Sequence, residues 1–122
     1  MSKNYTIQRS PLIIPAPDNK SIIEVFGQAT TGDSNLSLAH MVAPPGWSEP
    51  CQTPEFDEYV YILKGKKQFN VAGEIIVVSK GEAIKIHKNV RVQYSNPFNE
   101  SCEYIAICTP AFDLNTVHRE DL

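Results

Sequence analysis

The feature that most constrains this chain is a regular series of short apolar runs separated by turn-forming residues. No window of helical length shows 3.6-residue periodicity with caps, and only residues 113–117 are expected to make a short helical turn. Short runs at such regular spacing predict an all-β sandwich or barrel. The runs expected to form strands are 21–28, 35–42, 58–63, 66–70, 74–78, 83–86, 90–94 and 103–108.

Length and composition favour one folded domain. The chain has 122 residues, of which 42% are hydrophobic and 20% are charged, which is ordinary usage for a globular protein. Pro11, Pro15 and Pro17 exclude a helix near the start and predict an extended arm or edge strand. We therefore expect an arm over 1–20, a β-barrel over 21–110 and a tail over 111–122.

Charge and cysteine usage exclude several classes of function. A formal net charge of −3 provides no basic surface and argues against a nucleic-acid binder. No apolar run approaches the ~20 residues that span a bilayer, and residues 1–10 lack the apolar core of a secretion signal. Cys51, Cys102 and Cys108 are read as reduced thiols. Together these features predict a cytoplasmic protein that binds neither nucleic acid nor membrane.

Two spaced motifs narrow the fold. Gly46 is followed after five residues by Gln52 and Pro54, then by Glu58 and, after six more residues, by Gly65. Further along, the second motif consists of Gly81, His87, Asn89, Val92 and Asn96. In glycine spacing and order, this pair resembles the two motifs of the cupin family, which implies a double-stranded β-helix, a jelly-roll-like barrel. The run 52–59 and the tail 109–120 also resemble a bacterial branch of that family with undefined activity.

The departures from the cupin pattern concern the metal site. In metal-dependent cupins the two histidines and the glutamate of the first motif, together with the histidine of the second, bind a transition metal. The corresponding positions here are Gln52, Pro54, Glu58 and Val92, of which only Glu58 is an ordinary ligand. A transition metal requires several converging imidazole, carboxylate or thiolate groups. We therefore predict that no metal is bound at these positions.

Glu58 and His40 are the candidate catalytic residues. The resemblance implies that Glu58 faces the barrel interior, where a carboxylate in partly apolar surroundings is suited to acid–base chemistry. His40 shares strand parity with Leu36, Leu38 and Val42, so the four side chains lie on one face of the strand. We expect this face to turn inward. The alternatives are a hydrogen-bonded structural carboxylate and a core histidine with its partners satisfied.

Gln52, Tyr94 and Trp47 are the candidate ligand-binding residues. Tyr94 shares strand parity with Val92, so both side chains are expected to point into the lumen. Trp47 lies on the proline-rich approach loop, where it either caps a ligand or packs on the barrel end. Ordinary packing is the alternative for all three residues. The lysines of the 64–67 turn are expected to belong to a solvated hairpin.

Three functions follow from these residues. The first is a cupin that binds a small organic molecule in its lumen without a transition metal, with Glu58 and His40 available for isomerisation or epimerisation. The second is a metal-dependent isomerase or dioxygenase with a rearranged ligand set of His40, Gln52 and Glu58. The third is a non-catalytic dimerisation or regulatory module. A homodimer is expected because strands near the N-terminus otherwise leave an exposed edge.

Overall fold

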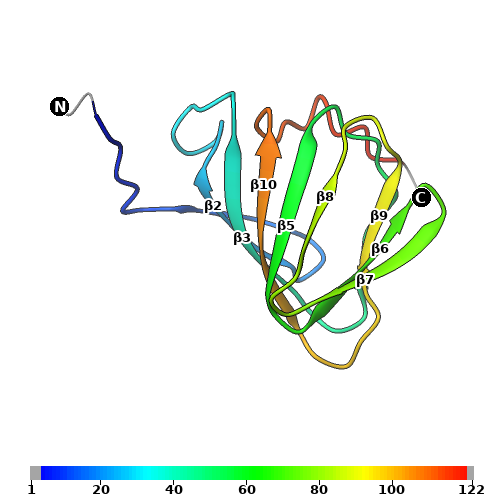
Figure 1. Cartoon of the computed structure of the whole chain (residues 1–122). Coiled ribbons are helices and arrows are strands. Elements are labelled where there is room, and N and C mark those ends of the chain that lie inside the picture. Colours follow the sequence, from blue (N-terminus) through cyan, green and yellow to red (C-terminus); the bar gives the residue numbers. More distant parts are fainter. Residues whose placement is uncertain (1–3, 121–122) are drawn as a thin grey trace.

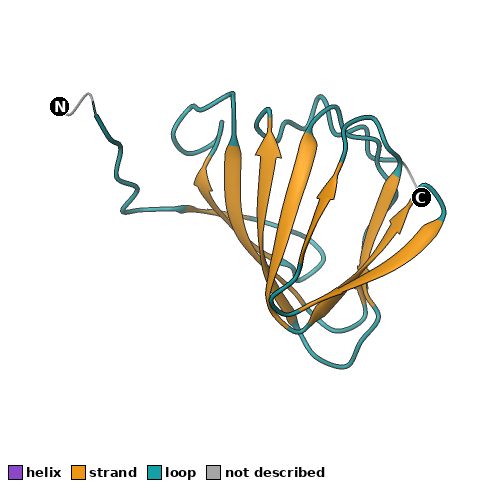
Figure 2. Cartoon of the chain, in the orientation of Figure 1, coloured by secondary structure: helices purple, strands orange, loops and turns teal. Residues whose placement is uncertain are grey.

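The computed structural model describes residues 4–120, and within them it consists of strands and loops without helices (Figure 2). This part of the chain therefore contains no helix capable of crossing a membrane. The all-β fold class expected from the spacing of the apolar runs is confirmed. The strands are β1 (Leu12–Ile14), β2 (Ser21–Phe26), β3 (Ser37–Ala43), β4 (Trp47–Ser48), β5 (Asp57–Lys64), β6 (Lys66–Val71), β7 (Glu74–Ser79), β8 (Ala83–Ile86), β9 (Val92–Asn96) and β10 (Cys102–Thr109).

Two antiparallel sheets form the barrel. One contains six strands in the order β1-β2-β3-β10-β5-β8, and the other contains four in the order β4-β9-β6-β7. Figure 1 shows the sheets meeting at the lower end and diverging at the upper end, where the C-terminal segment runs across the opening. This jelly-roll arrangement places the inward side chains of both sheets around one lumen.

The structure differs from the sequence expectation at two places. The proline-rich loop contains a short strand, β4, which pairs Trp47 with Asn96 of β9. The predicted helical turn near the C-terminus is an isolated turn in which the Thr116 amide donates to the Asp113 carbonyl at 3.0 Å. The N-terminal segment, expected to form an extended arm or edge strand, contributes the edge strand β1, which pairs with β2.

The core follows the period-two alternation of the strands. In β10, Cys102, Tyr104, Ala106 and Cys108 are buried, while the residues between them face the outer side of the six-stranded sheet. From the four-stranded sheet, Phe69 and Tyr94 meet edge to face with ring centroids 5.8 Å apart. Large aromatic side chains therefore fill much of the lumen.

The C-terminal segment packs onto the diverging end of the barrel. Phe56, Cys108, Val117 and Phe112 form a second apolar cluster there. The Glu55 amide donates to the Thr116 carbonyl at 3.0 Å, and backbone bonds also join the segment to residues 51–53. This packing covers the end of the barrel at which β5 begins, where Glu58 is located.

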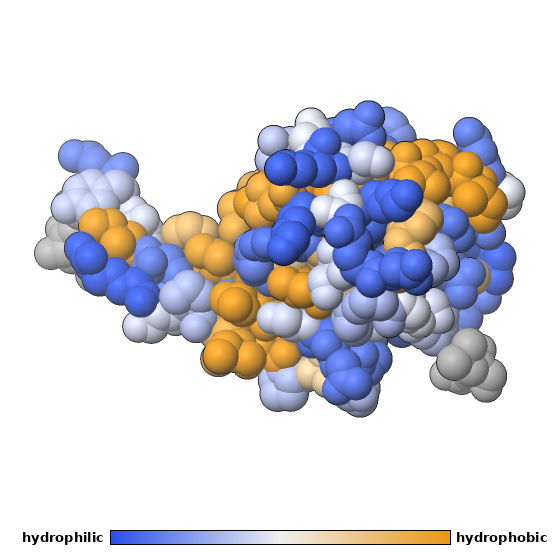
Figure 3. Space-filling view, turned by 90° about the horizontal axis from the view of Figure 1, so that it is seen from below, coloured by the Kyte–Doolittle hydropathy of each residue, from blue (hydrophilic) through white to orange (hydrophobic). Residues whose placement is uncertain are grey.

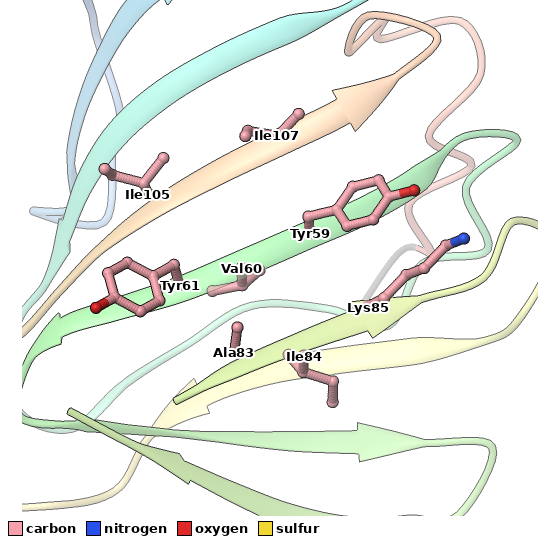
Figure 4. Close-up of a pocket in the computed structure, with 8 residues that line it drawn as sticks. All are labelled: Tyr59, Val60, Tyr61, Ala83, Ile84, Lys85, Ile105 and Ile107. Carbon is pink, nitrogen blue, oxygen red and sulfur yellow. The ribbon is translucent and has the colours of Figure 1, made fainter. Parts of the chain in front are cut away.

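The outer surface carries apolar side chains of its own. A hollow on the outer side of the six-stranded sheet is lined by Tyr59, Val60, Tyr61, Ala83, Ile84, Lys85, Ile105 and Ile107 (Figure 4). Figure 3 shows further hydrophobic groups gathered beside the N-terminal segment, in which Ile7 and Ile13 are exposed. The homodimer expected from the sequence stays a prediction.

Candidate functional site

Glu58 and Tyr94 meet across the lumen at its upper end. Glu58 extends from β5 and accepts a hydrogen bond from the Tyr94 hydroxyl of β9 through Oε1. The Sγ of Cys108 lies 3.9 Å from the other carboxylate oxygen. Burial, reinforced by the charge of Glu58, raises the pKa of Tyr94 well above its ordinary value. The inward orientation of Tyr94 and Val92 expected from strand parity is confirmed.

Gln52 holds the C-terminal segment against the barrel. Its backbone forms bridges to Val92 and to Arg119, and its side chain is buried. The Gln52 Oε1 accepts from the Arg119 Nε at 3.3 Å and from Nη2 at 3.2 Å. Arg119 also lies 3.9 Å from the carboxylate of Glu49. The amide oxygen that was a candidate ligand-binding group is therefore engaged by Arg119.

Trp47 belongs to the barrel wall. It forms β4 and is buried, and its indole Nε1 donates to the Asp18 carboxylate at 2.6 Å. This bond ties the segment between β1 and β2 to the four-stranded sheet. Of the two roles expected for Trp47, the contacts of the described residues correspond to packing.

The prediction of which face of β3 turns inward is wrong. Ser37, Ala39 and Ala43 are buried, whereas His40 lies on the outer side of the sheet, with its Nε2 2.6 Å from the Glu103 carboxylate. Small side chains face inward because the aromatic residues of the opposing strands occupy the lumen. In a strand the choice of face is all or none, since a shift of one residue exchanges every side chain.

His40 and Glu58 consequently lie on opposite faces of the same sheet. They cannot act as the acid–base pair expected from the sequence. The rearranged metal site of His40, Gln52 and Glu58 is not assembled either. Within residues 4–120 no group of three or more His, Cys, Asp or Glu side chains is placed to hold a metal ion. The residues at the cupin ligand positions therefore do not fit a transition metal.

The sequence analysis missed Lys67, the most unusual side chain of the lumen. Lys67 on β6 is only 2% exposed, so the expectation of a solvated hairpin is wrong for this residue. Its Nζ lies 3.7 Å from the ring centroid of Tyr104 and 4.7 Å from that of Tyr94. No hydrogen-bond acceptor or ion-pair partner reaches this atom within residues 4–120. The sequence signal that could have revealed the inward orientation of Lys67 is its strand parity with Phe69, which lies two residues further along β6.

Lys20 brings a second ammonium group to the same rings. It precedes β2, and its Nζ lies 4.4 Å from the Trp47 centroid and 5.7 Å from that of Tyr104. Burial lowers the pKa of Lys20, although Glu49 and Glu58 oppose the shift. Burial and then the charge of Lys20 lower the pKa of Lys67 to about 7. The site thus contains two desolvated cations beside one another.

Tyr104 supplies an unpartnered hydroxyl. Among the described residues its OH is buried and has no hydrogen-bond partner. Burial raises the pKa of Tyr104 well above its ordinary value, so the hydroxyl remains protonated and able to donate. A buried polar group without a partner costs about 1–3 kcal/mol. Such a group indicates a missing partner, and it lies on the ring that Lys67 covers.

We expect His40→Ala to have a small effect. The His40–Glu103 pair is partly exposed, at 32% and 38% of the side-chain surfaces, and pairs of this kind contribute about 0–1 kcal/mol. The free energy of unfolding measured in urea should therefore fall by less than about 1 kcal/mol. A loss of several kcal/mol would contradict the outer placement of His40.

Comparisons with known proteins agree with this architecture. The cupin domain model matches residues 39–108. An RmlC-like cupin from Shewanella frigidimarina has a TM-score of 0.73 at 16% identity, with 92% of this chain and 95% of that chain covered. The polyketide cyclase RemF from Streptomyces resistomycificus has a TM-score of 0.74 at 18% identity, with 100% and 87% covered. At these identities the likeness concerns the fold.

A curated relative is closer in sequence. The chain is 43% identical over 112 residues to a protein of Myxococcus xanthus named endoribonuclease YbeY. The match covers 92% of this chain but only 38% of the length of that protein. The matched cupin model extends over more than half of the chain and includes β5 to β9, which contribute Glu58, Lys67 and Tyr94. The chain therefore belongs to the cupin family.

Proposed function

We propose that this chain binds a small organic anion, a carboxylate, in the lumen of its barrel. The observation that carries the proposal is the buried Tyr104 hydroxyl, which has no hydrogen-bond partner within residues 4–120, beneath the ammonium group of the buried Lys67. Both are hydrogen-bond donors, and a carboxylate accepts from two donors at once. Binding would give the Tyr104 hydroxyl the partner that it lacks among the described residues and would place an anion beside the Lys67 ammonium.

Charge in the lumen supports an anionic ligand. Lys20 and Lys67 approach the same rings of Trp47 and Tyr104, and their charges repel each other. Among the nearby acids, the Glu58 carboxylate is occupied by the Tyr94 hydroxyl, and Glu49 lies 3.9 Å from Arg119. An anion between the two ammonium groups would offset this repulsion.

The surrounding side chains limit the size of the ligand. Phe69, Tyr94, Trp47 and Tyr104 stand around Lys67, with ring centroids between 3.7 and 5.8 Å from its Nζ. Because these rings crowd the ammonium group, the ligand that we propose is a compact molecule of a few carbon atoms and not a long chain. Small β-barrels commonly hold one small ligand among apolar walls and a few polar groups.

The name of the Myxococcus relative supports a different activity, which we do not propose for this chain. The match covers 38% of that protein, so its ribonuclease function need not reside in the matched part. This chain has a net charge of −3, whereas RNA binding relies on basic surfaces. A small anionic ligand agrees better with a pair of buried lysines.

Calorimetric titration with lactate, a compact carboxylate that is ionised at neutral pH, tests the proposal. Because only protonated Lys67 attracts an anion, and its pKa is about 7, affinity should fall by about thirtyfold between pH 6 and pH 8.5. Lys67→Met should abolish binding at both pH values.

Lys85→Met provides the matched control. Lys85 is exposed on β8 and faces the outer hollow, so its replacement should leave lactate binding unchanged (Figure 4). Binding that survives Lys67→Met, or the absence of binding by the unaltered protein at pH 6, would overturn the proposal.

A further inference from the structure

We propose that Lys67 is a nucleophile that forms an imine with the carbonyl group of a small oxo acid held in the lumen. The inference rests on the proposed function, because the carboxylate of the same molecule would be held at the same site. It adds a chemical class, the 2-oxo acids, and a covalent step to simple binding.

The geometry isolates the Lys67 amine. Lys67 extends inward from β6, beside Phe69 on the same face of the strand. Its Nζ is surrounded by aromatic rings, of which that of Tyr104 is nearest at 3.7 Å. No carboxylate within residues 4–120 forms an ion pair with it. A lysine held in this way lacks the partner that ordinarily keeps a buried ammonium charged.

Burial and the charge of Lys20 favour the neutral amine form of Lys67. Desolvation and the charge of Lys20 lower the pKa of Lys67 to about 7, while Glu58 and Glu49 act in the opposite direction, as does the Cys102 thiol of β10. The phenols of Tyr94 and Tyr104 remain neutral near pH 7. About half of the Lys67 side chains are then unprotonated at pH 7, against roughly one in three thousand for an ordinary lysine. A desolvated lysine next to a second cation is a known route to a nucleophilic amine.

The covalent step balances with the groups present. The Nζ lone pair attacks the carbonyl carbon, the carbon–oxygen π pair moves to oxygen, and oxygen takes up a proton while nitrogen loses one. This gives a carbinolamine with a new carbon–nitrogen bond. Departure of the hydroxyl group with a proton, as water, then leaves the carbon–nitrogen double bond. The sum is amine plus carbonyl giving imine plus water, and no oxidant or reductant is needed.

Two neighbouring groups can move the protons. The Tyr104 hydroxyl, which has no partner among the described residues, can donate to the oxygen of the attacked carbonyl. The Glu58 carboxylate accepts a hydrogen bond from the Tyr94 hydroxyl and can receive a proton through that hydroxyl. Lys20 remains as the cation that pairs with the ligand carboxylate. Each polar group that the lumen leaves unexplained thus acquires a role.

Reductive trapping tests the inference. The protein is incubated with pyruvate and sodium cyanoborohydride, which reduces an imine to a stable secondary amine, and intact mass and peptide mapping locate the adduct. We expect one adduct per chain, at Lys67, with a trapping rate that rises about tenfold between pH 6 and pH 8. The lysines of β5, β6 and β8 at positions 64, 66 and 85 are exposed and serve as internal controls.

Lys20→Gln distinguishes a tuned nucleophile from a merely accessible one. Because the charge of Lys20 lowers the pKa of Lys67, its removal should shift the pH midpoint of trapping upward. Adducts spread over exposed lysines, or none at Lys67, would overturn the inference. Lactate has no ketone, so its titration reports on binding alone. Lactate binding without pyruvate trapping would refute the imine and leave the proposed function standing.

Discussion

Replacing Lys67 with methionine is expected to stabilise the protein, by about 4 kcal/mol at pH 7. Lys67 is 2% exposed and forms no ion pair within the described part of the chain, so the folded state binds its proton more weakly than the unfolded chain does. Methionine fills a similar volume among the same rings and carries no charge. The free energy of unfolding from urea titrations provides the measurement.

The pH dependence of this difference identifies its cause. The pKa of Lys67 is about 7 in the folded state and 10.5 ordinarily, so between these values the unfolded chain binds more protons. The free energy of unfolding of the unaltered protein therefore rises as pH increases from about 7 toward 10.5, because the folded state no longer holds a buried charge at Lys67. The advantage of Lys67→Met over the unaltered protein should be largest at pH 6 and should shrink by pH 9.

Lys85→Met is the control for this experiment too. The Lys85 ammonium lies 5.2 Å from the Tyr59 ring on an exposed face, so its loss should change stability by less than about 0.5 kcal/mol at any pH. A gain in Lys67→Met that does not vary with pH would show that packing, and not charge, is responsible. A loss of stability in that variant would contradict the burial of an unpaired ammonium.

The fold was predictable because its determinants are local. Turn residues separate the strands. The strand predicted over 83–86, for example, has the same bounds in the structure as β8. The second motif also predicts its own geometry. Asn89 adopts a positive φ of 65°, and Asn96 donates to the carbonyls of Ala43, Pro44 and Glu100. These residues shape the backbone, so the motif spacing predicts the turn and the loop contacts independently of the residues at the ligand positions.

The site was only partly predictable because it depends on which face of each strand is buried. For Glu58 and Tyr94 the motif register supplied the face. For β3 the apolar residues seemed to mark the inner face, yet both faces of the six-stranded sheet carry apolar side chains. Lys67 was assigned to solvent because lysines are rarely buried. Only the aromatic rings contributed by distant strands make its burial understandable.

Gly65→Ala is expected to be strongly destabilising, by about 3 kcal/mol or more, because two costs combine. Gly65, the last residue of the first motif, joins β5 to β6 with a φ of 74°, which costs other residues about 1–2 kcal/mol. A Cβ at this position would also lie 2.5 Å from the Ser101 carbonyl oxygen and 3.3 Å from the Cys102 Cα. Backbone atoms at that distance must move, and Cys102 begins β10 at the centre of the larger sheet.

Gly73→Ala separates the two costs. Gly73 turns β6 into β7 with a φ of 92°, but nothing lies within 4 Å of a Cβ added there. We expect this variant to lose only about 1–2 kcal/mol, the conformational part alone. Urea titrations of both variants measure the difference, which is attributable to the contact with Ser101. Equal losses in the two variants would mean that the close approach of β10 to the Gly65 turn contributes nothing, and that the motif glycine is required for its φ alone.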